Sequence, residues 1–258
     1  MKQRIITAII ALALFLPVAI YGGWPFTVFI SIIGIIGLLE FIKMGNLNPY
    51  KVPAVASMAA LLLLLYPLPW FQESFGKTEI FVSYLVILLL YTVVSKNKFT
   101  FDHAALILMA TLYVSFGFFY LLETREAGLV YFFYVLVIIW TTDTGAYVTG
   151  RAMGKRKLWP DISPNKTVEG AIGGILLSCV MAVAFHFSFD LQVSLVALIG
   201  TTILASIFGQ LGDLVESAFK RHYGVKDTGN ILPGHGGILD RFDSMLFVFP
   251  ILHIIGFL

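Results

Sequence analysis

The segment KRHYGVKDTGNILPGHGGILDRFDS gathers cations, carboxylates and glycines in a chain that is otherwise poor in charge. It begins at Lys220 and is immediately preceded by GQLGDLVESAF. Four polar residues across this junction are spaced i, i+3, i+4 and i+7, so they share one helical face: Asp213, Glu216, Ser217 and Lys220. Asp240 and Asp243 are spaced i, i+3 and share a face of a second helix.

Carboxylates brought together in a low-dielectric setting repel one another, and a divalent cation between them relieves the repulsion. Ligands that are all oxygen atoms favour magnesium over zinc, and magnesium binds a few carboxylates together with substrate phosphates. Four cations of the segment are placed to meet phosphate oxygens: Lys220, Arg221, Lys226 and Arg241. Glycines beside His235 allow backbone amides to approach a ligand closely. We therefore expect a metal-and-phosphate site, the alternative being salt bridges that link Asp240, Arg241 and Asp243.

A second polar segment, TGRAMGKRKLWPDISPNKTVEG, follows an apolar run that contains Asp143. An ionisable residue inside such a run is a functional hypothesis by default, although a paired structural Asp is the alternative. In SPNKT, Ser163, Asn165 and Lys166 offer hydrogen-bond donors and a cation. Thr167 is expected to cap the next helix, whose N-terminus would suit a phosphate. An ordinary capped loop explains this segment equally well.

The amino-acid composition indicates what kind of secondary structure positions these residues. Of the 258 residues, 59% are hydrophobic and only 12% are charged, about half the charged fraction of a soluble domain. We therefore predict an all-α, polytopic integral membrane protein. The net charge of +2 is too small to indicate nucleic-acid binding, and a single cysteine excludes an intramolecular disulfide.

Apolar runs long enough to cross a bilayer predict about nine transmembrane helices. They cover roughly 5–21, 24–43, 52–69, 79–95, 103–122, 128–148, 170–188, 192–212 and 238–257. With the N-terminus inside, 15 of the 17 Lys and Arg residues face the cytoplasm and 2 face outward, which supports an N-in, C-out topology. We expect one transmembrane domain over 1–258, with hydrophobic helices in 1–125 and the catalytic half in 126–258.

The polar segment resembles the signature of the phosphatidate cytidylyltransferase (CDP-diacylglycerol synthase) family. The resemblance covers 27 residues, and every constrained position of the signature is filled. The matching residues are Ser217, Phe219, Lys220, Arg221, Lys226, Asp227, Gly229, Leu232, Pro233, His235, Gly236, Gly237, Ile238, Asp240, Arg241, Phe242 and Asp243. DTGAYVTGR and SPNKTVEG look like the family's other polar stretches, whereas the N-terminal half matches only in being hydrophobic.

The resemblance implies a magnesium-dependent reaction in which CTP and phosphatidic acid give CDP-diacylglycerol and pyrophosphate. It implies that Asp213 and Asp240 bind the metal and that Asp243 assists them. Further catalytic positions by the signature are Lys220, Arg221, Lys226, Asp227, His235 and Arg241. Positions that would contact the nucleotide are Asp143, Ser163, Asn165, Lys166, Ser217, Gly236 and Gly237.

The same resemblance implies a multi-pass protein of the plasma membrane whose site faces the cytoplasm, where CTP meets phosphatidic acid of the inner leaflet. Members of the family also suggest a homodimer. A secondary transporter is an alternative, but it would show matched broken helices and charges near mid-bilayer. A CTP-dependent lipid kinase or a prenyl-phosphate transferase is a further alternative. A CDP-alcohol phosphotransferase would need an Asp-rich motif containing Asp-Gly, which is absent from the sequence.

Overall fold

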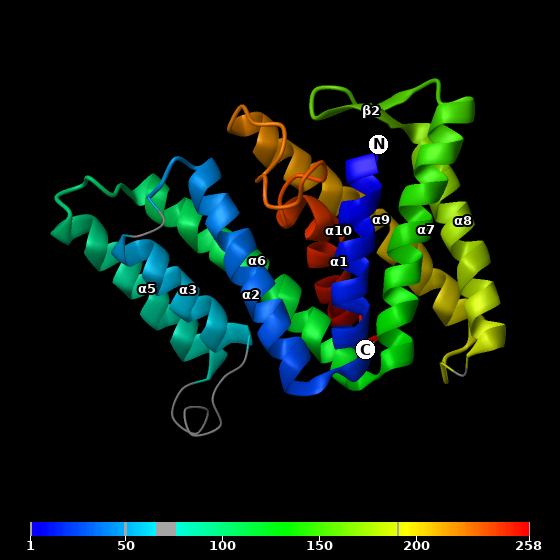
Figure 1. Ribbon diagram of the computed structural model, residues 1–258, viewed down its shortest axis with the longest axis horizontal. Helices are drawn as coiled ribbons and strands as arrows, with labels where there is room; N and C mark the ends of the chain where they lie inside the picture. Colours follow the sequence, from blue (N-terminus) through cyan, green and yellow to red (C-terminus); the bar gives the residue numbers. More distant parts are fainter. Residues whose placement is uncertain (1, 49–50, 66–75, 190, 258) are drawn as a thin grey trace. The chain divides into compact units, whose positions relative to one another are not determined.

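The computed structural model describes residues 2–48, 51–65, 76–189 and 191–257, and they are mostly helical (Figure 1). The helices are α1 (Lys2–Tyr21), α2 (Gly23–Met44), α3 (Val52–Leu65), α5 (Lys77–Val94), α6 (Phe101–Ala127), α7 (Leu129–Met153), α8 (Val168–Ser188), α9 (Leu195–His222) and α10 (Leu239–Ile254). The predicted all-α fold is confirmed. An antiparallel hairpin of β1 (Lys157–Trp159) and β2 (Ser163–Thr167) adds strands that the sequence analysis did not predict.

Six of the described helices are long and apolar enough to cross a membrane, namely α2, α5, α6, α7, α8 and α9. Ile6–Tyr21 of α1 and the whole of α3 are shorter apolar helices, and α10 has 16 residues. The end of the third predicted span, 66–69, lies outside the described residues. Several apolar helices therefore support a membrane protein, while nine spans and their orientation stay a prediction.

Contacts among the described residues divide the chain into two compact units. The first unit holds the residues up to Leu122 together with Val225–Asp240, and the second holds Glu123–Gly224 together with the residues from Arg241 onward. The glycine-rich loop that carries His235 thus belongs to the first unit, and most of α10 belongs to the second. The predicted assignment of catalysis to 126–258 stays a prediction.

In the first unit, α1 and α2 are joined by a tight glycine turn. Gly22 has φ 71° and Gly23 has φ 55°, a left-handed conformation that glycine adopts without steric strain. Farther along, α3 packs against α2 and α5. A buried hydrogen-bonded chain joins Ser57, Tyr84 and Thr111 through their hydroxyl groups, at 2.7 Å and 2.9 Å. These helices therefore satisfy their few polar groups internally, as an apolar environment requires.

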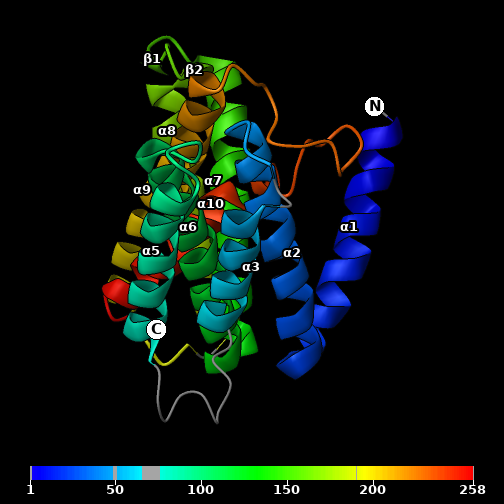
Figure 2. The same ribbon diagram turned by 90° about the vertical axis from the view of Figure 1, so that its left-hand side faces the viewer.

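In the second unit, α7 packs along α8 and also contacts α9, with the hairpin at one end of α7 and α8 (Figures 1 and 2). The ring of Phe132 on α7 stacks on that of Phe249 on α10, with centroids 6.0 Å apart. The buried hydroxyl groups of Tyr134 and Thr202 lie 2.6 Å apart and link α7 to α9. This core fixes the ends of α7, α8 and α9, where the polar residues gather.

Helix α9 continues to His222, ten residues beyond the predicted end of its apolar run. No glycine or proline interrupts the helix between Asp213 and His222, so the hydrogen-bonded backbone can propagate past the apolar stretch. Asp213, Glu216, Ser217 and Lys220 consequently lie on one uninterrupted helix, which confirms that they share a face.

Candidate active site

The hairpin of the second unit is fastened to α9 by two polar contacts. Lys166 Nζ lies 2.6 Å from Asp213 Oδ2, and Arg221 Nε donates to the carbonyl oxygen of Ile162 at 3.3 Å. Pro164 is tolerated in β2 because a two-stranded hairpin consists only of edge strands. SPNKT is thus a strand held beside α9 rather than a plain loop.

The start of α8 is capped as the sequence predicted. Gly170 N donates to Thr167 Oγ1 at 3.1 Å, and Thr167 is extended, as expected of an N-cap residue. The carboxylate of Glu169 accepts hydrogen bonds from the backbone amides of Lys155 and Arg156. These contacts fix the connection between α7 and the hairpin, so that Lys166 projects from a rigid support.

Glycines allow α7 and α8 to approach closely at this end of the unit. A Cβ atom added at Gly145 would lie 2.9 Å from the carbonyl oxygen of Gly173, and one added at Gly174 would lie 2.7 Å from that of Thr142. Real Cβ atoms essentially never come so near a backbone atom. Gly145 and Gly174 therefore set the distance between α7 and α8 at the level of Asp143.

A cleft of about 420 Å³ opens between these elements. Its lining includes four residues that the sequence analysis selected: Asp143, Asn165, Lys166 and Asp213. It also includes polar residues that were missed, Tyr147, Arg151 and Gln210. Arg151 Nη1 donates to the hydroxyl oxygen of Tyr147 at 3.0 Å. Two cations and two carboxylates in one cleft suit a charged ligand with both phosphate groups and a counter-ion.

The missed residues carry a signal in the sequence. Tyr147 and Arg151 follow Asp143 at i+4 and i+8, so all three lie on one face of α7. Gln210 precedes Asp213 by three residues on α9, and its side-chain amide donates to the carbonyl oxygen of Ala171 at 3.3 Å. Extending each helical face outward from its carboxylate would have found these residues.

Three carboxylates of the second unit, those of Asp143, Asp213 and Asp243, are close enough to interact electrostatically. Gly212 makes this approach possible, because a Cβ there would lie 2.7 Å from the carbonyl oxygen of Asp243. Helix α10 therefore passes directly against α9 beside Asp213. Ser217 Oγ, one turn along α9, donates to Asp213 Oδ1 at 3.4 Å.

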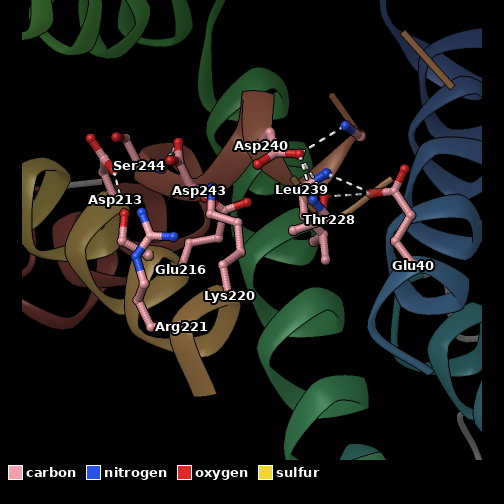
Figure 3. A network of polar contacts seen from close by, with 12 residues as sticks. Glu40, Asp213, Glu216, Lys220, Arg221, Thr228, Leu239, Asp240, Asp243 and Ser244 are labelled. Carbon is pink, nitrogen blue, oxygen red and sulfur yellow. Dashed lines mark hydrogen bonds and ion pairs between the residues drawn. The ribbon is translucent and has the colours of Figure 1, made fainter. Parts of the chain in front are cut away.

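Lys220 forms a partly buried ion pair with Glu216 in the same unit (Figure 3). The distance from Nζ to Oε2 is 2.6 Å, and the Glu216 side chain is 2% exposed. A buried carboxylate needs such a partner, because an uncompensated buried charge is strongly destabilising. Lys220 therefore has a structural contact in addition to its predicted role at a phosphate.

The first unit contains a separate carboxylate cluster, at the loop before α10 (Figure 3). Asp240 Oδ2 accepts hydrogen bonds from Thr228 N at 2.8 Å, Thr228 Oγ1 at 2.9 Å and Gly237 N at 2.8 Å. The bond to Gly237, three residues earlier, resembles a capping box. One oxygen of Asp240 thus holds the loop closed around the start of α10.

Glu40 on α2, which was not among the site residues predicted from the sequence, completes this cluster. Its two carboxylate oxygens accept from Ile238 N at 2.9 Å and Leu239 N at 3.0 Å. These are amides at the start of α10, where a helix leaves donors unsatisfied and favours negative charge. Thr228 Oγ1 lies 3.2 Å from Glu40 Oε2. Glu40 is 6% exposed and lies within an apolar run, which is the signal that would have identified it.

Glycines are also required inside this cluster. A Cβ at Gly237 would lie 2.5 Å from Glu40 Oε2, and Gly236 has φ 83°, a left-handed conformation. Gly236 and Leu232 form an isolated bridge, with Leu232 N donating to the carbonyl oxygen of Gly236 at 3.0 Å. His235 is half-buried between them. The HGG motif therefore has a steric reason for its two glycines within the unit.

The other selected residues lie at the surface of their own units. Lys226, Asp227 and Asn165 are exposed, as are Arg221 and Arg241, whereas Ser163 is half-buried. Each unit thus presents signature residues of its own. The structure assembles Asp143, Lys166 and Asp213 in the second unit and Asp240 with Gly236 and Gly237 in the first.

The carboxylates of the second unit supply only oxygen atoms, which fits a hard cation such as magnesium. Within the described parts of the chain, however, no three Asp, Glu, His or Cys side chains are already arranged as a metal-binding group. Magnesium commonly completes its shell with water and substrate phosphate rather than with protein ligands alone. The donor chemistry is therefore compatible with magnesium, while the ligand set stays a prediction.

Comparison with known proteins identifies the family to which this chain belongs. A family model described as the Cytidylyltransferase family matches residues 2–258. The chain is 50% identical over 258 residues to the phosphatidate cytidylyltransferases of Staphylococcus aureus (strain COL) and Staphylococcus haemolyticus (strain JCSC1435). A further relative, from Staphylococcus saprophyticus subsp. saprophyticus, is 49% identical. These matches cover 99% of this chain and 98% of each relative. The chain belongs to the cytidylyltransferase family.

Proposed function

We propose that this protein transfers the cytidylyl group of CTP to phosphatidic acid, forming CDP-diacylglycerol and releasing pyrophosphate. The observation that carries this proposal is the full-length similarity to phosphatidate cytidylyltransferases, at 50% identity over 99% of the chain. The family model agrees over residues 2–258. The cleft of the second unit supplies a site whose cations and carboxylates suit a nucleotide phosphate.

The reaction is a substitution at phosphorus. A phosphate oxygen of phosphatidic acid forms a bond to the α-phosphorus of CTP, and the bond from that phosphorus to the bridging oxygen of the β-phosphate breaks. Pyrophosphate departs with that electron pair. Because the nucleophile is already an anion, the chain need not supply a strong base. Its main task is to bring two polyanions together and to hold them in line.

Lys166 and Arg151 face this task in the cleft of the second unit. Lys166 stands on a rigid strand and Arg151 is oriented by Tyr147, so both can neutralise phosphate oxygens with little loss of side-chain freedom. Asn165 adds an amide in the same lining. We assign CTP phosphate contacts to these residues. The signature cations Lys220, Arg221, Lys226 and Arg241, with Asp227, His235 and Ser217, are proposed to complete substrate binding.

Magnesium dependence is part of the same proposal. Asp213, Asp240 and Asp243 would hold the ion, and Asp143 lies within electrostatic reach of Asp213 and Asp243. The ion would neutralise phosphate charge as the α-phosphorus is attacked. Asp213 contacts a cation, Lys166, and a bound magnesium ion would share or replace that contact.

The membrane arrangement is also proposed. The protein would lie in the plasma membrane with nine spans, its site facing the cytoplasm and drawing phosphatidic acid from the inner leaflet. The charge asymmetry of the loops supports an N-in, C-out topology. A reporter fused after residue 258 should be active only if it works outside the cell. Cytoplasmic reporter activity would refute the odd number of spans. A homodimer, which the family resemblance suggests, completes the proposal.

The activity is tested with the full chain purified in detergent. Pyrophosphate release should require both CTP and phosphatidic acid, and the lipid product should carry cytidine. Asp213→Asn should abolish release, whereas Asp161→Asn, at an exposed site in the hairpin turn, should not. Release from CTP without a lipid acceptor would contradict the proposed transfer, and so would lipid phosphorylation in place of cytidylyl transfer.

A further inference from the structure

A second polar cleft, of about 610 Å³, lies in the first unit. It opens where the end of α2, the start of α3, the end of α5 and the start of α6 come together. Three lysines and a histidine line it: Lys51, Lys96, Lys98 and His103. None of its lining residues belongs to the cleft of the second unit, and the proposed cytidylyl transfer makes no use of it.

The charge of this cleft has one sign. Among the described residues that line it there is no Asp or Glu, so no lining carboxylate neutralises the lysines. All three lysines are exposed. Asn46 and Ser95 add neutral polar groups to the same lining. A site of this kind attracts an anion, and lysines and hydroxyl groups recognise phosphate oxygens in particular.

The histidine is oriented by a local hydrogen bond. Thr100 N donates to His103 Nδ1 at 3.1 Å, so Nδ1 is occupied as an acceptor and Nε2 is the ring nitrogen left to contact a ligand. The reciprocal bond, from His103 N to Thr100 Oγ1 at 3.3 Å, fixes the first turn of α6. His103 therefore presents its Nε2 from a helix start that local hydrogen bonds hold in place.

The turn that carries two of the lysines is strained and well defined. Lys96 has φ 52° and Asn97 has φ 58°, a left-handed backbone conformation that residues other than glycine and asparagine rarely adopt. Lys96 N donates to Val93 O at 2.9 Å, Asn97 N to Thr92 O at 3.0 Å, and Phe99 N to Ser95 Oγ at 3.1 Å. A non-glycine residue in this conformation is consistent with a functional demand on the turn.

The remaining wall of the cleft is apolar. Val94, Phe99, Ile107 and Pro53 line it beside the lysines. The helices α2, α5 and α6, whose ends meet there, are among those long and apolar enough to cross a membrane. In a bilayer spanned by such helices, a cleft at their ends would lie at headgroup level, where basic pockets between helices bind anionic lipid headgroups. The apolar wall would accommodate the glycerol and the first carbons of the acyl chains.

We propose that this cleft binds the phosphate of an anionic phospholipid headgroup. The combination of an uncompensated basic rim with an apolar wall favours a lipid over a small soluble phosphate, because a soluble anion has no use for the apolar surface. The simplest competing explanation is the general excess of positive charge on the cytoplasmic side of membrane proteins. Under that explanation every exposed lysine at these helix ends contributes equally to lipid binding, whereas a binding site in the cleft requires the three lysines that line it to contribute more.

The chain offers a matched control for this distinction. Lys43 is exposed in the last turn of α2, at the same group of helix ends, but it does not line the cleft. The test variant is the triple change Lys51→Gln, Lys96→Gln and Lys98→Gln, and the control variant is Lys43→Gln. A second triple variant, with arginine at the same three positions, keeps the charge and checks that loss of binding does not merely reflect altered folding.

Full-length proteins in detergent are titrated with phosphatidylglycerol or with zwitterionic phosphatidylcholine, and retained lipid is measured by native mass spectrometry. Wild type, Lys43→Gln and the arginine variant should retain phosphatidylglycerol. The glutamine triple variant should bind it at least about tenfold more weakly, given about 1 kcal/mol per lysine near an anionic surface. Thermal melting should show that all four proteins are folded.

Three outcomes would overturn the proposal. A loss of binding free energy in the glutamine triple variant no greater than three times the loss in Lys43→Gln would show a diffuse charge effect and no site, because the triple variant removes three lysines and the control removes one. Retention of phosphatidylcholine as strong as that of phosphatidylglycerol would remove the role of the phosphate charge. Complete displacement of the lipid by inorganic phosphate at equal concentration would assign the cleft to a soluble anion. Because binding is measured without CTP, these outcomes are independent of the cytidylyl transfer activity.

Discussion

The two carboxylate clusters of this protein are built in opposite ways. In the second unit, Asp213 is 35% exposed at its side chain and is paired with the side-chain cation of Lys166 beside a cleft. In the first unit, Glu40 and Asp240 are buried, and backbone amides supply four of their hydrogen bonds. A side-chain ion pair at a cleft can exchange its partner for a ligand, whereas a carboxylate bound by backbone amides is tied to the fold. The first arrangement suits binding and the second suits positioning.

Asp240 gives the clearest test of this contrast, because it is tied to backbone amides and is also a predicted metal ligand. Asp240→Asn keeps an oxygen that can accept from Thr228 and Gly237, so thermal stability should stay near that of wild type. If Asp240 also binds magnesium, the loss of a negative charge from the metal's ligands should reduce activity by orders of magnitude, because a metal ion supplies several kcal/mol of charge stabilisation. Melting in detergent and magnesium-dependent pyrophosphate release measure the two effects.

Asp240→Ala is the companion variant, since it removes all three hydrogen bonds and should lower stability as well as activity. An Asp240→Asn protein that melts early but keeps normal specific activity where folded would exclude the metal role and leave positioning alone.

Glu40 should behave as a residue of the fold. Glu40→Gln replaces one acceptor oxygen with an NH₂ group that faces a backbone amide, leaving a buried donor unsatisfied at a cost of about 1–3 kcal/mol of stability. We expect a lower melting temperature and faster proteolysis of the 225–240 loop. Glu79→Gln, at an exposed position in the first turn of α5, serves as the control and should melt like wild type. Normal melting of Glu40→Gln would contradict the positioning role.

Lys166 tests the binding role of the carboxylate cluster in the second unit. Lys166→Ala removes the partner of Asp213 and the proposed cation for a CTP phosphate, a contribution of about 1–3 kcal/mol for a partly solvated charged contact. Turnover with CTP should fall by about tenfold or more while the folded fraction stays unchanged. The measurement is steady-state pyrophosphate release with circular dichroism as the folding check. Activity within about twofold of wild type would make the hairpin a purely structural element.

The close approach of α9 to α10 can be tested at Gly212. A methyl group there would press on the backbone of Asp243, so Gly212→Ala should separate α9 from α10 at a cost of about 1–3 kcal/mol. Gly200→Ala on the same helix meets nothing within 4 Å and should be neutral or slightly stabilising. Comparing the melting temperatures of the two variants isolates the close approach from helix propensity. Equal stability of both would show that this approach is not required.

The class of fold and many of the chemical groups follow directly from the amino-acid sequence. Low charge and long apolar runs require helices that satisfy their own backbone in lipid, so an all-α fold follows from composition. Helical spacing grouped Asp213 with Ser217 and Glu216 with Lys220, and both contacts are present. The cap at Thr167 was also predictable, because a capping interaction involves residues only three positions apart.

Which distant residues come into contact is not encoded in any local pattern and depends on the packing of the folded chain. Lys166 and Asp213 are 47 positions apart, and Glu40 reaches the start of α10 across about 200 residues. Such contacts depend on how helices pack, and here the packing distance is set by backbone positions such as Gly145 and Gly212 rather than by a local pattern. Spacing along a helix reports one face of one element, whereas the identity of the facing element is settled by the whole chain. For this reason the sequence named the carboxylates, but the fold alone separated those tied to backbone amides from those beside a cleft.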